Sequence, residues 1–196
     1  ILACVFCFIL IMITGYRSPE ITGVLDGYSA QEEGLQAGDV ITEINGRNVH
    51  IWDDVSLYTM THADEAPFKV EYERDGKKYT AKLEPRQLEG DAAPLLGVTS
   101  GDIVKPGIFK SVEYSIYKVK YWMNYTVDSL RMLVTGQAGL KDLSGPVGIV
   151  NAVDDMYQEA APAGFGVVML SMMNFGVLLT TNLGILNLLP LPALDG

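Results

Sequence analysis

Both ends of this chain lack charged side chains, and this feature restricts the possible folds more than any other. Residues 1–16 and 160–194 contain no Asp, Glu, Lys or Arg, although the chain has 14 basic and 24 acidic residues. Within the second run, residues 165–186 are long enough as a helix to cross a bilayer, which takes about 20 apolar residues. The sequence therefore places an acidic, water-soluble middle between two apolar ends.

The first apolar run is shorter than a membrane span. As a helix, residues 1–14 would rise about 21 Å, whereas the hydrocarbon core is about 30 Å thick. We interpret residues 1–16 as the end of a transmembrane helix whose first turns precede this chain. Cys4 and Cys7 form a C-x-x-C pair there, but no polar neighbour would stabilise a thiolate. We read them as small apolar residues of a membrane helix.

Charge and cysteine content exclude two classes of protein. The formal net charge is −10, which repels the phosphate backbone of nucleic acids, so no nucleic-acid partner is expected. Two cysteines are too few for a scaffold held together by disulfides.

Residues 19–104 read as a small α/β module with short elements and tight turns. A capping box between Ser29 and Glu32 is expected to open a single helical turn that ends at Gly34. The other expected elements are a strand at 21–25, a strand at 40–44 closed by an Asn-Gly turn, a helix at 52–61, a hairpin at 68–83 with an Asp-Gly turn, and a strand at 95–99.

One stretch of this module resembles a known signature. Residues 29–46 match the S-A-x-x-x-G-L-x-x-G-D-x-I…I-N-G pattern of bacterial, circularly permuted PDZ domains. The resemblance implies that a peptide adds as a strand beside Leu96, Gly97 and Val98, against the helix of residues 53–61. A side chain at Gly97 is then expected to crowd the added strand. The alternative is an empty groove that serves as a spacer or steric gate.

A long amphipathic helix is expected after the module, over residues 108–135. It carries too many charges to span a bilayer, and its tyrosines and Trp122 are typical of membrane interfaces. We predict that it lies at the membrane surface, and the alternative is packing on the PDZ module. Apolar residues recur at spacings of three and four: Phe109, Val112, Ile116, Val119, Met123, Val127, Leu130 and Val134.

Asp195 is the one acidic residue in the last apolar segment, residues 163–196. A carboxylate at membrane depth is costly, so it is a functional-site candidate. Pro190 and Pro192 precede it, and each removes a backbone donor and disfavours a continuing helix. Such irregular backbone is tolerated in a membrane only where protein or a water-filled cavity satisfies it.

The string from Asn187 to Gly196 matches the N-x-x-P-x-P-x-L-D-G motif of site-2 proteases, the intramembrane zinc metalloproteases. A connector at residues 140–162 carries the S-G-P stretch of bacterial members, at Ser144, Gly145 and Pro146. The resemblance implies that Asp195 is a zinc ligand and that Asn187 hydrogen-bonds the substrate backbone.

The resemblance also implies a fold and a setting. The expected fold class is a membrane α-helical protein with an inserted soluble α+β domain, the circularly permuted PDZ domain. The expected location is the bacterial plasma membrane, with several spans and the PDZ domain outside the cytoplasm. Expected partners are the lipid bilayer and membrane-protein or peptide substrates, such as anti-sigma factors or signal-peptide remnants, cut by regulated intramembrane proteolysis.

One family feature is missing from the sequence. The H-E-x-x-H motif that supplies two zinc ligands and the general base is absent, and His50 and His62 do not form it. We interpret the chain as a fragment without that helix, which is expected to be inactive by itself and to contain no catalytic residue. The alternative functions are a pseudoprotease or a non-catalytic, membrane-anchored PDZ adaptor.

Overall fold

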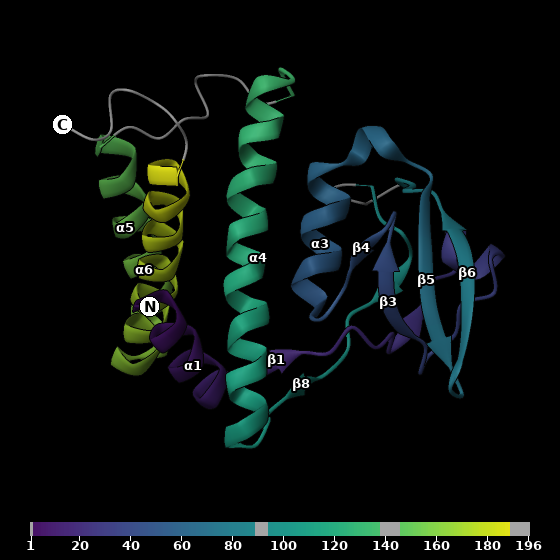
Figure 1. Ribbon diagram of the computed structural model, residues 1–196, viewed down its shortest axis with the longest axis horizontal. Helices are drawn as coiled ribbons and strands as arrows, with labels where there is room; N and C mark the ends of the chain where they lie inside the picture. Colours follow the sequence, from purple (N-terminus) through teal and green to yellow (C-terminus); the bar gives the residue numbers. More distant parts are fainter. Residues whose placement is uncertain (1, 89–93, 138–145, 189–196) are drawn as a thin grey trace. The chain divides into compact units, whose positions relative to one another are not determined.

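The computed structural model describes residues 2–88, 94–137 and 146–188, and the chain forms two compact units (Figure 1). The α/β unit is Gly15–Val104, and the helical unit combines Ile1–Thr14 with Lys105–Gly196. Each unit has its own cluster of buried apolar side chains. The mixed helix and sheet content agrees with the predicted combination of a helical part and an α+β part.

An antiparallel sheet with strand order β4-β3-β5-β6 forms the centre of the α/β unit. Its strands are β3 (Val40–Ile44), β4 (Arg47–Asn48), β5 (Phe68–Arg74) and β6 (Lys77–Leu83). Both predicted two-residue turns are confirmed: Asn45 and Gly46 have φ of 47° and 85°, and Asp75 and Gly76 have 51° and 72°. Such left-handed conformations match the twist of the flanking strands.

The core of this unit lies between the sheet and its helices. On β5, Phe68, Val70 and Tyr72 are buried in alternation with more exposed neighbours, as the pleat requires. The helix α3 (Trp52–Thr61) contributes Val55 and Tyr58 to the same core. A short 3-10 turn, η1 (Ala63–Glu65), follows α3.

Two short strand pairs join the beginning of the α/β unit to its end. The strand β1 (Tyr16–Arg17) pairs with β8 (Ile103–Val104), and β2 (Gly23–Val24) pairs with β7 (Val98–Thr99). The predicted strands at 21–25 and 95–99 are therefore present but shorter. Segments flanking β2 and β7 use other partners: the Ile21 N–H donates to the Asp39 carbonyl, and Leu95 bridges to Arg86.

The predicted capping box at Ser29 is wrong. The helical turn α2 (Ser29–Glu32) has Tyr28 at its N-cap, and no side-chain cap hydrogen bond forms there. The Ser29 hydroxyl instead donates to the Glu84 carbonyl over 2.8 Å and accepts the Glu84 N–H over 3.0 Å. The Ser29 hydroxyl is therefore bonded to the backbone of Glu84, directly after β6, and does not cap its own helix. Gly34 has φ of 76°, as expected for the residue that ends the turn.

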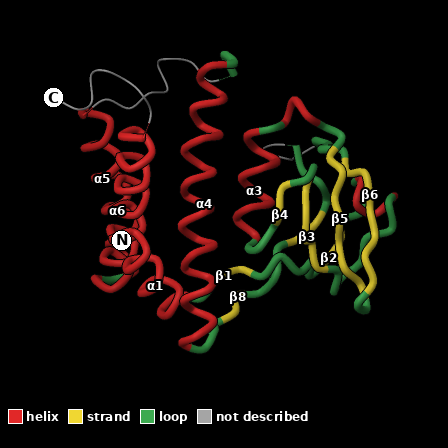
Figure 2. The backbone as a smooth tube through the Cα atoms, viewed as in Figure 1, coloured by secondary structure: helices red, strands yellow, loops and turns green. Residues whose placement is uncertain are grey.

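The described part of the helical unit is built from helices, drawn in red in Figure 2. Its elements are α1 (Leu2–Thr14), α4 (Ile108–Val134), α5 (Pro146–Ala160), the 3-10 turn η3 (Ala161–Ala163) and α6 (Phe165–Leu188). Within the described residues, one helical stretch, Phe165–Ile185, is long and apolar enough to cross a membrane. The segment expected only as a connector contains α5, a helix that the sequence analysis did not anticipate.

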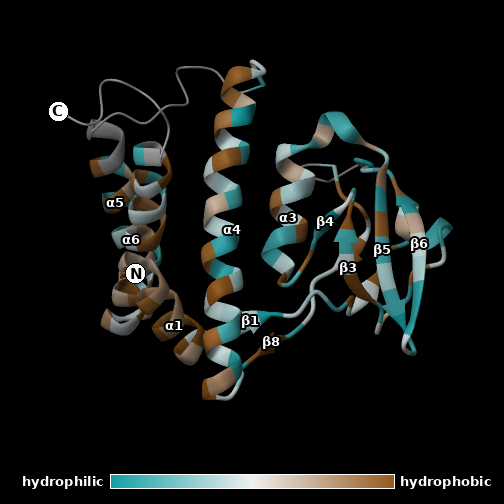
Figure 3. Cartoon of the chain, in the orientation of Figure 1, coloured by the Kyte–Doolittle hydropathy of each residue, from teal (hydrophilic) through white to brown (hydrophobic). Residues whose placement is uncertain are grey.

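The helix α4 packs mainly through a face other than its apolar stripe. Trp122 joins Cys7 of α1 and Val177 of α6 in the buried cluster of this unit, and Ser111, Ser115 and Thr126 are also buried. Most of the apolar stripe remains exposed, with Phe109 93% and Ile116 59% accessible, although Val119 packs against the buried cluster. Figure 3 shows hydrophobic and hydrophilic residues interleaved along α4. An exposed stripe of this kind is typical of a helix that contacts lipid or another apolar partner.

Candidate functional site

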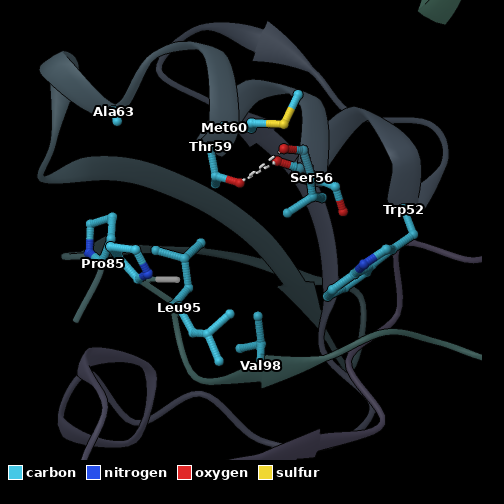
Figure 4. A pocket seen from close by; sticks show the side chains of 11 residues that line it. Trp52, Ser56, Thr59, Met60, Ala63, Pro85, Leu95 and Val98 are labelled. Carbon is cyan, nitrogen blue, oxygen red and sulfur yellow. Dashed lines mark hydrogen bonds between the residues drawn. The ribbon is translucent and has the colours of Figure 1, made fainter. Parts of the chain in front are cut away.

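A groove of about 420 Å³ lies in the α/β unit between α3 and the segment that leads into β7 (Figure 4). Side chains of α3 form one wall, and Leu95 and Val98 face them from the other, with Trp52 and Pro85 toward the two ends. The complete lining is Trp52, Val55, Ser56, Thr59, Met60, Ala63, Pro85, Pro94, Leu95, Leu96 and Val98. The groove lies between the helix and the segment for which the sequence predicts peptide binding, and Gly97 is not among its lining residues.

The α3 wall is set by helix periodicity and by a buried cap. Its lining residues recur at spacings of three and four, so they share one face of the helix. At the start of α3, Asp54 Oδ2 accepts the N–H of His50 over 3.0 Å and that of Ile51 over 3.3 Å. Burial raises the pKa of Asp54, although these two N–H donors oppose the rise. The cap fixes where α3 begins and so where Trp52 enters the groove.

The opposite wall is fixed by backbone hydrogen bonds. The Leu25 N–H donates to the Gly97 carbonyl over 2.8 Å, and the Ala30 N–H donates to the Leu96 carbonyl over 3.3 Å. Gly97 has φ of 83°, and an added Cβ would lie 2.1 Å from the Cβ of Tyr28. The expectation that a Gly97 side chain would crowd the added strand therefore needs correction, because the first collision is with Tyr28 inside the unit.

The groove is chemically apolar. None of its described lining residues carries a formal charge, and its polar side-chain groups are the hydroxyls of Ser56 and Thr59 and the indole N–H of Trp52. The Thr59 hydroxyl donates within its own helix, 3.0 Å from the Val55 carbonyl. A ligand would consequently be held by apolar side chains and backbone pairing, with no cationic side chain in the lining to bind a carboxylate.

The groove does not contain the candidate residues of the site-2 protease motifs. Asn187 is exposed in the last turn of α6, and Asp195 and the S-G pair at 144–145 fall outside the described residues. His62 is buried, stacks on Tyr58 at 4.3 Å between ring centroids, and places Nδ1 2.8 Å from the Thr61 hydroxyl. Among the described residues, no group of three or more His, Cys, Asp or Glu could hold a metal ion. The described side chains thus do not assemble a zinc site.

Comparison with known proteins assigns the whole chain to one family. The family model for peptidase family M50 matches residues 1–196. The chain belongs to peptidase family M50. This M50 chain is 34% identical over 198 residues to the zinc metalloprotease RasP of Bacillus licheniformis, covering 100% of the chain and 45% of that relative. It is 33% identical over 199 residues to the regulator of sigma-W protease RasP of Bacillus subtilis, again covering 100% of the chain and 45% of the relative.

The M50 chain spans about half the length of the curated relatives it matches. Among solved structures, it is similar to the PDZ domain of an SdrC-like protein from Listeria monocytogenes. That similarity has a TM-score of 0.35 and 24% identity, and it covers 43% of this chain and 88% of the PDZ structure.

The sequence predicts peptide binding beside Leu96, Gly97 and Val98, and the groove lining includes Leu96 and Val98 but not Gly97. The sequence places Pro85 and Pro94 in a linker and Leu95 in a strand, and all three line the groove. The signal that could have found the α3 lining is the recurrence of Trp52, Ser56 and Thr59 along one helix face. Pro85 and Pro94 had no such signal, because they come together only through the bridge between Arg86 and Leu95.

Proposed function

We propose that the protein is an intramembrane zinc metalloendopeptidase that cleaves single-span membrane proteins. The observation that carries this proposal is the match of the M50 family model to every residue of the chain. The relatives named zinc metalloproteases support the cofactor and the reaction, and the apolar helix α6 supports a site within the membrane.

The substrate class follows from the same relatives. One of them is named a regulator of sigma-W protease, which supports membrane-bound regulatory proteins such as anti-sigma factors as substrates, with signal-peptide remnants as a related class. We place the protein in the bacterial plasma membrane as a multi-pass protein, with the α/β unit outside the cytoplasm as a circularly permuted PDZ domain.

Two regions of this chain would contact the substrate. Asp195 would be one zinc ligand, because it belongs to the L-D-G motif, and Asn187 would hydrogen-bond the extended substrate, because its amide both donates and accepts. The groove between α3 and Leu96-Gly97-Val98 would bind an apolar peptide segment as an added strand, since its lining is apolar.

The experiment is zinc removal and restoration on the protein as its gene encodes it. The purified protein in detergent is incubated with a single-span test substrate before chelation, after chelation, and after zinc is returned. We expect cleavage to stop on chelation and to return with about one zinc per protein. A soluble peptide that reproduces only the extramembrane part of the substrate serves as the control and should stay intact. Chelator-resistant cleavage would contradict the proposal.

A further inference from the structure

A polar contact joins α4 to α6 inside the helical unit. The hydroxyl of Thr126 lies within hydrogen-bond distance of the side-chain oxygen of Asn182, and it is also 3.0 Å from the Trp122 carbonyl of its own helix. Thr126 is buried, and so is Thr181, the neighbour of Asn182 on α6. The contact therefore sits in a packed interface and not at an exposed helix edge.

This interface contains further polar atoms. Trp122 Nε1 and Thr181 Oγ1 are buried and have no hydrogen-bond partner among the described residues. Trp122 lies one turn before Thr126, and Thr181 is adjacent to Asn182. An unpaired polar group in an apolar environment is costly. Breaking the Thr126–Asn182 contact would leave the Asn182 side-chain oxygen without this donor in the same apolar interface, whereas the Thr126 hydroxyl would keep the Trp122 carbonyl. The contact therefore restrains how the helices pack.

The helix α6 needs such a restraint because its composition does not fix its rotation. It is apolar with almost no difference between its faces, so the hydrophobic effect favours no particular side. In a membrane, specific packing and hydrogen bonds must therefore decide which face meets the neighbouring helices. Here Val177, which is fully buried, and Asn182 provide these contacts.

The position of Asn187 depends on that rotation. Asn187 follows Asn182 by five residues in the same helix, which corresponds to about 8 Å along the axis and about 140° around it. A slip of one residue in the rotation of α6 would turn Asn187 by about 100°.

We infer that Thr126 and Asn182 are positioning residues, which set the direction of Asn187 by fixing the rotation of α6 against α4. The activity part of this inference rests on the proposed function, whereas its geometric part does not. Neither residue is assigned contact with substrate or zinc.

The geometric test measures the reactivity of residue 187 directly. All variants carry Asn187→Cys in a background with Cys4→Ala and Cys7→Ala, and a water-soluble maleimide labels residue 187 in the detergent-solubilised protein. Thr126→Val removes the hydroxyl at nearly constant shape, Thr126→Ser retains it, and Thr135→Val is the matched control at the exposed end of α4. Elution as a single peak in size-exclusion chromatography confirms that each variant is folded.

We expect Thr126→Val to change the labelling rate of residue 187 about three- to tenfold, as the loss of one interhelical hydrogen bond would. Thr126→Ser and Thr135→Val should stay within about twofold of the parent. An unchanged rate in Thr126→Val would overturn the inference, and so would an equal change in Thr126→Ser or Thr135→Val.

The activity test uses the protein with its natural Asn187 and cysteines. Thr126→Val and Asn182→Leu should each lower kcat about three- to tenfold with KM nearly unchanged, and the double variant should be no worse than either single variant. Additive losses, or a loss confined to KM, would count against a positioning role. If the wild-type protein cleaves no single-span substrate, the proposed function fails, and the labelling test still decides the inference.

Discussion

Arg74 holds Asp39 with two hydrogen bonds: its Nε donates to Oδ1 over 2.6 Å, and its Nη2 donates to Oδ2 over 2.7 Å. The same Asp39 Oδ2 accepts the Gln36 N–H over 2.8 Å, and Arg74 also donates to the Gly34 carbonyl over 2.9 Å. Asp39 is the aspartate of the G-L-x-x-G-D signature. Its role in this structure is therefore to tie the turn between Gly34 and Gly38 to β5.

This pair predicts how the stability of the α/β unit depends on acid. Burial acts to raise the pKa of Asp39, but the hydrogen bonds from Arg74 and Gln36 and the charge of Arg74 outweigh it and hold the pKa below its usual value. A carboxyl with a lowered pKa stabilises the folded state above about pH 4, and this contribution disappears as the pH falls through the folded-state pKa. We expect Asp39→Asn to lower the thermal midpoint at pH 7 on the order of 5 °C.

The measurement is thermal unfolding of wild type and Asp39→Asn from pH 7 to pH 2. The difference between their midpoints should shrink below about pH 4 as Asp39 in the wild type takes up its proton. Glu32→Gln is the matched control, because the Glu32–Arg86 pair at 2.6 Å is exposed and should contribute less. A difference that stayed constant across the whole range would contradict this role for Asp39.

A side chain at Gly97 should destabilise the α/β unit before it affects peptide binding. Gly97 and Gly34 both have positive φ, but a Cβ on Gly97 collides with Tyr28 whereas one on Gly34 meets nothing within 4 Å. We expect Gly34→Ala to cost about 1 kcal/mol from its backbone conformation alone, and Gly97→Ala to cost several times more. Urea unfolding of both variants measures the difference, and equal costs would show that the contact with Tyr28 does not matter.

The sequence predicted features that depend on nearby residues. The hairpin turns at Asn45-Gly46 and Asp75-Gly76 and the resemblance to site-2 proteases are confirmed, because turn residues and motif strings are local features of the sequence. The amphipathic helix expected over residues 108–135 corresponds to α4, Ile108–Val134. The predicted features that failed depend on distant partners. The Ser29 cap is replaced by a bond to Glu84, and Pro85 reaches the groove only through the pairing of segments far apart in sequence.

A charge placed in the groove should weaken the binding of apolar peptides. Met60 lines the groove and is 61% exposed, so Met60→Glu should leave the fold intact. The apolar end of a bound peptide would then lie beside a carboxylate. We expect at least a tenfold loss of affinity for a peptide with an apolar C-terminus, measured by fluorescence anisotropy on the whole chain. Leu88→Glu is the matched control, because Leu88 is 42% exposed and lies outside the groove lining. Absence of peptide binding in the wild type would leave the groove a steric role only.

The exposed stripe of α4 should contact lipid. A polarity-sensitive fluorophore on a cysteine at Ile116 is expected to shift to shorter wavelength when the protein moves from buffer with mild detergent into liposomes, because the stripe enters the interfacial region. The same label at Lys110, which is exposed and about a third of a turn away from the stripe, should shift much less. Equal spectra at both positions would argue against membrane contact through this stripe.

The most direct test of the proposed intramembrane protease is the replacement of Asp195 in the protein as its gene encodes it. Cleavage of a single-span substrate is measured for wild type, for Asp195→Ala, and for Asp155→Ala, which removes an exposed carboxylate of α5 outside the motif. We expect Asp195→Ala to express normally, to bind less zinc and to lose at least about a hundredfold in cleavage rate, because zinc sites need their full ligand set. Asp155→Ala should cleave like wild type. Wild-type turnover by Asp195→Ala would contradict the assignment of Asp195 to the zinc site and, with it, the proposed function of this C-terminal motif.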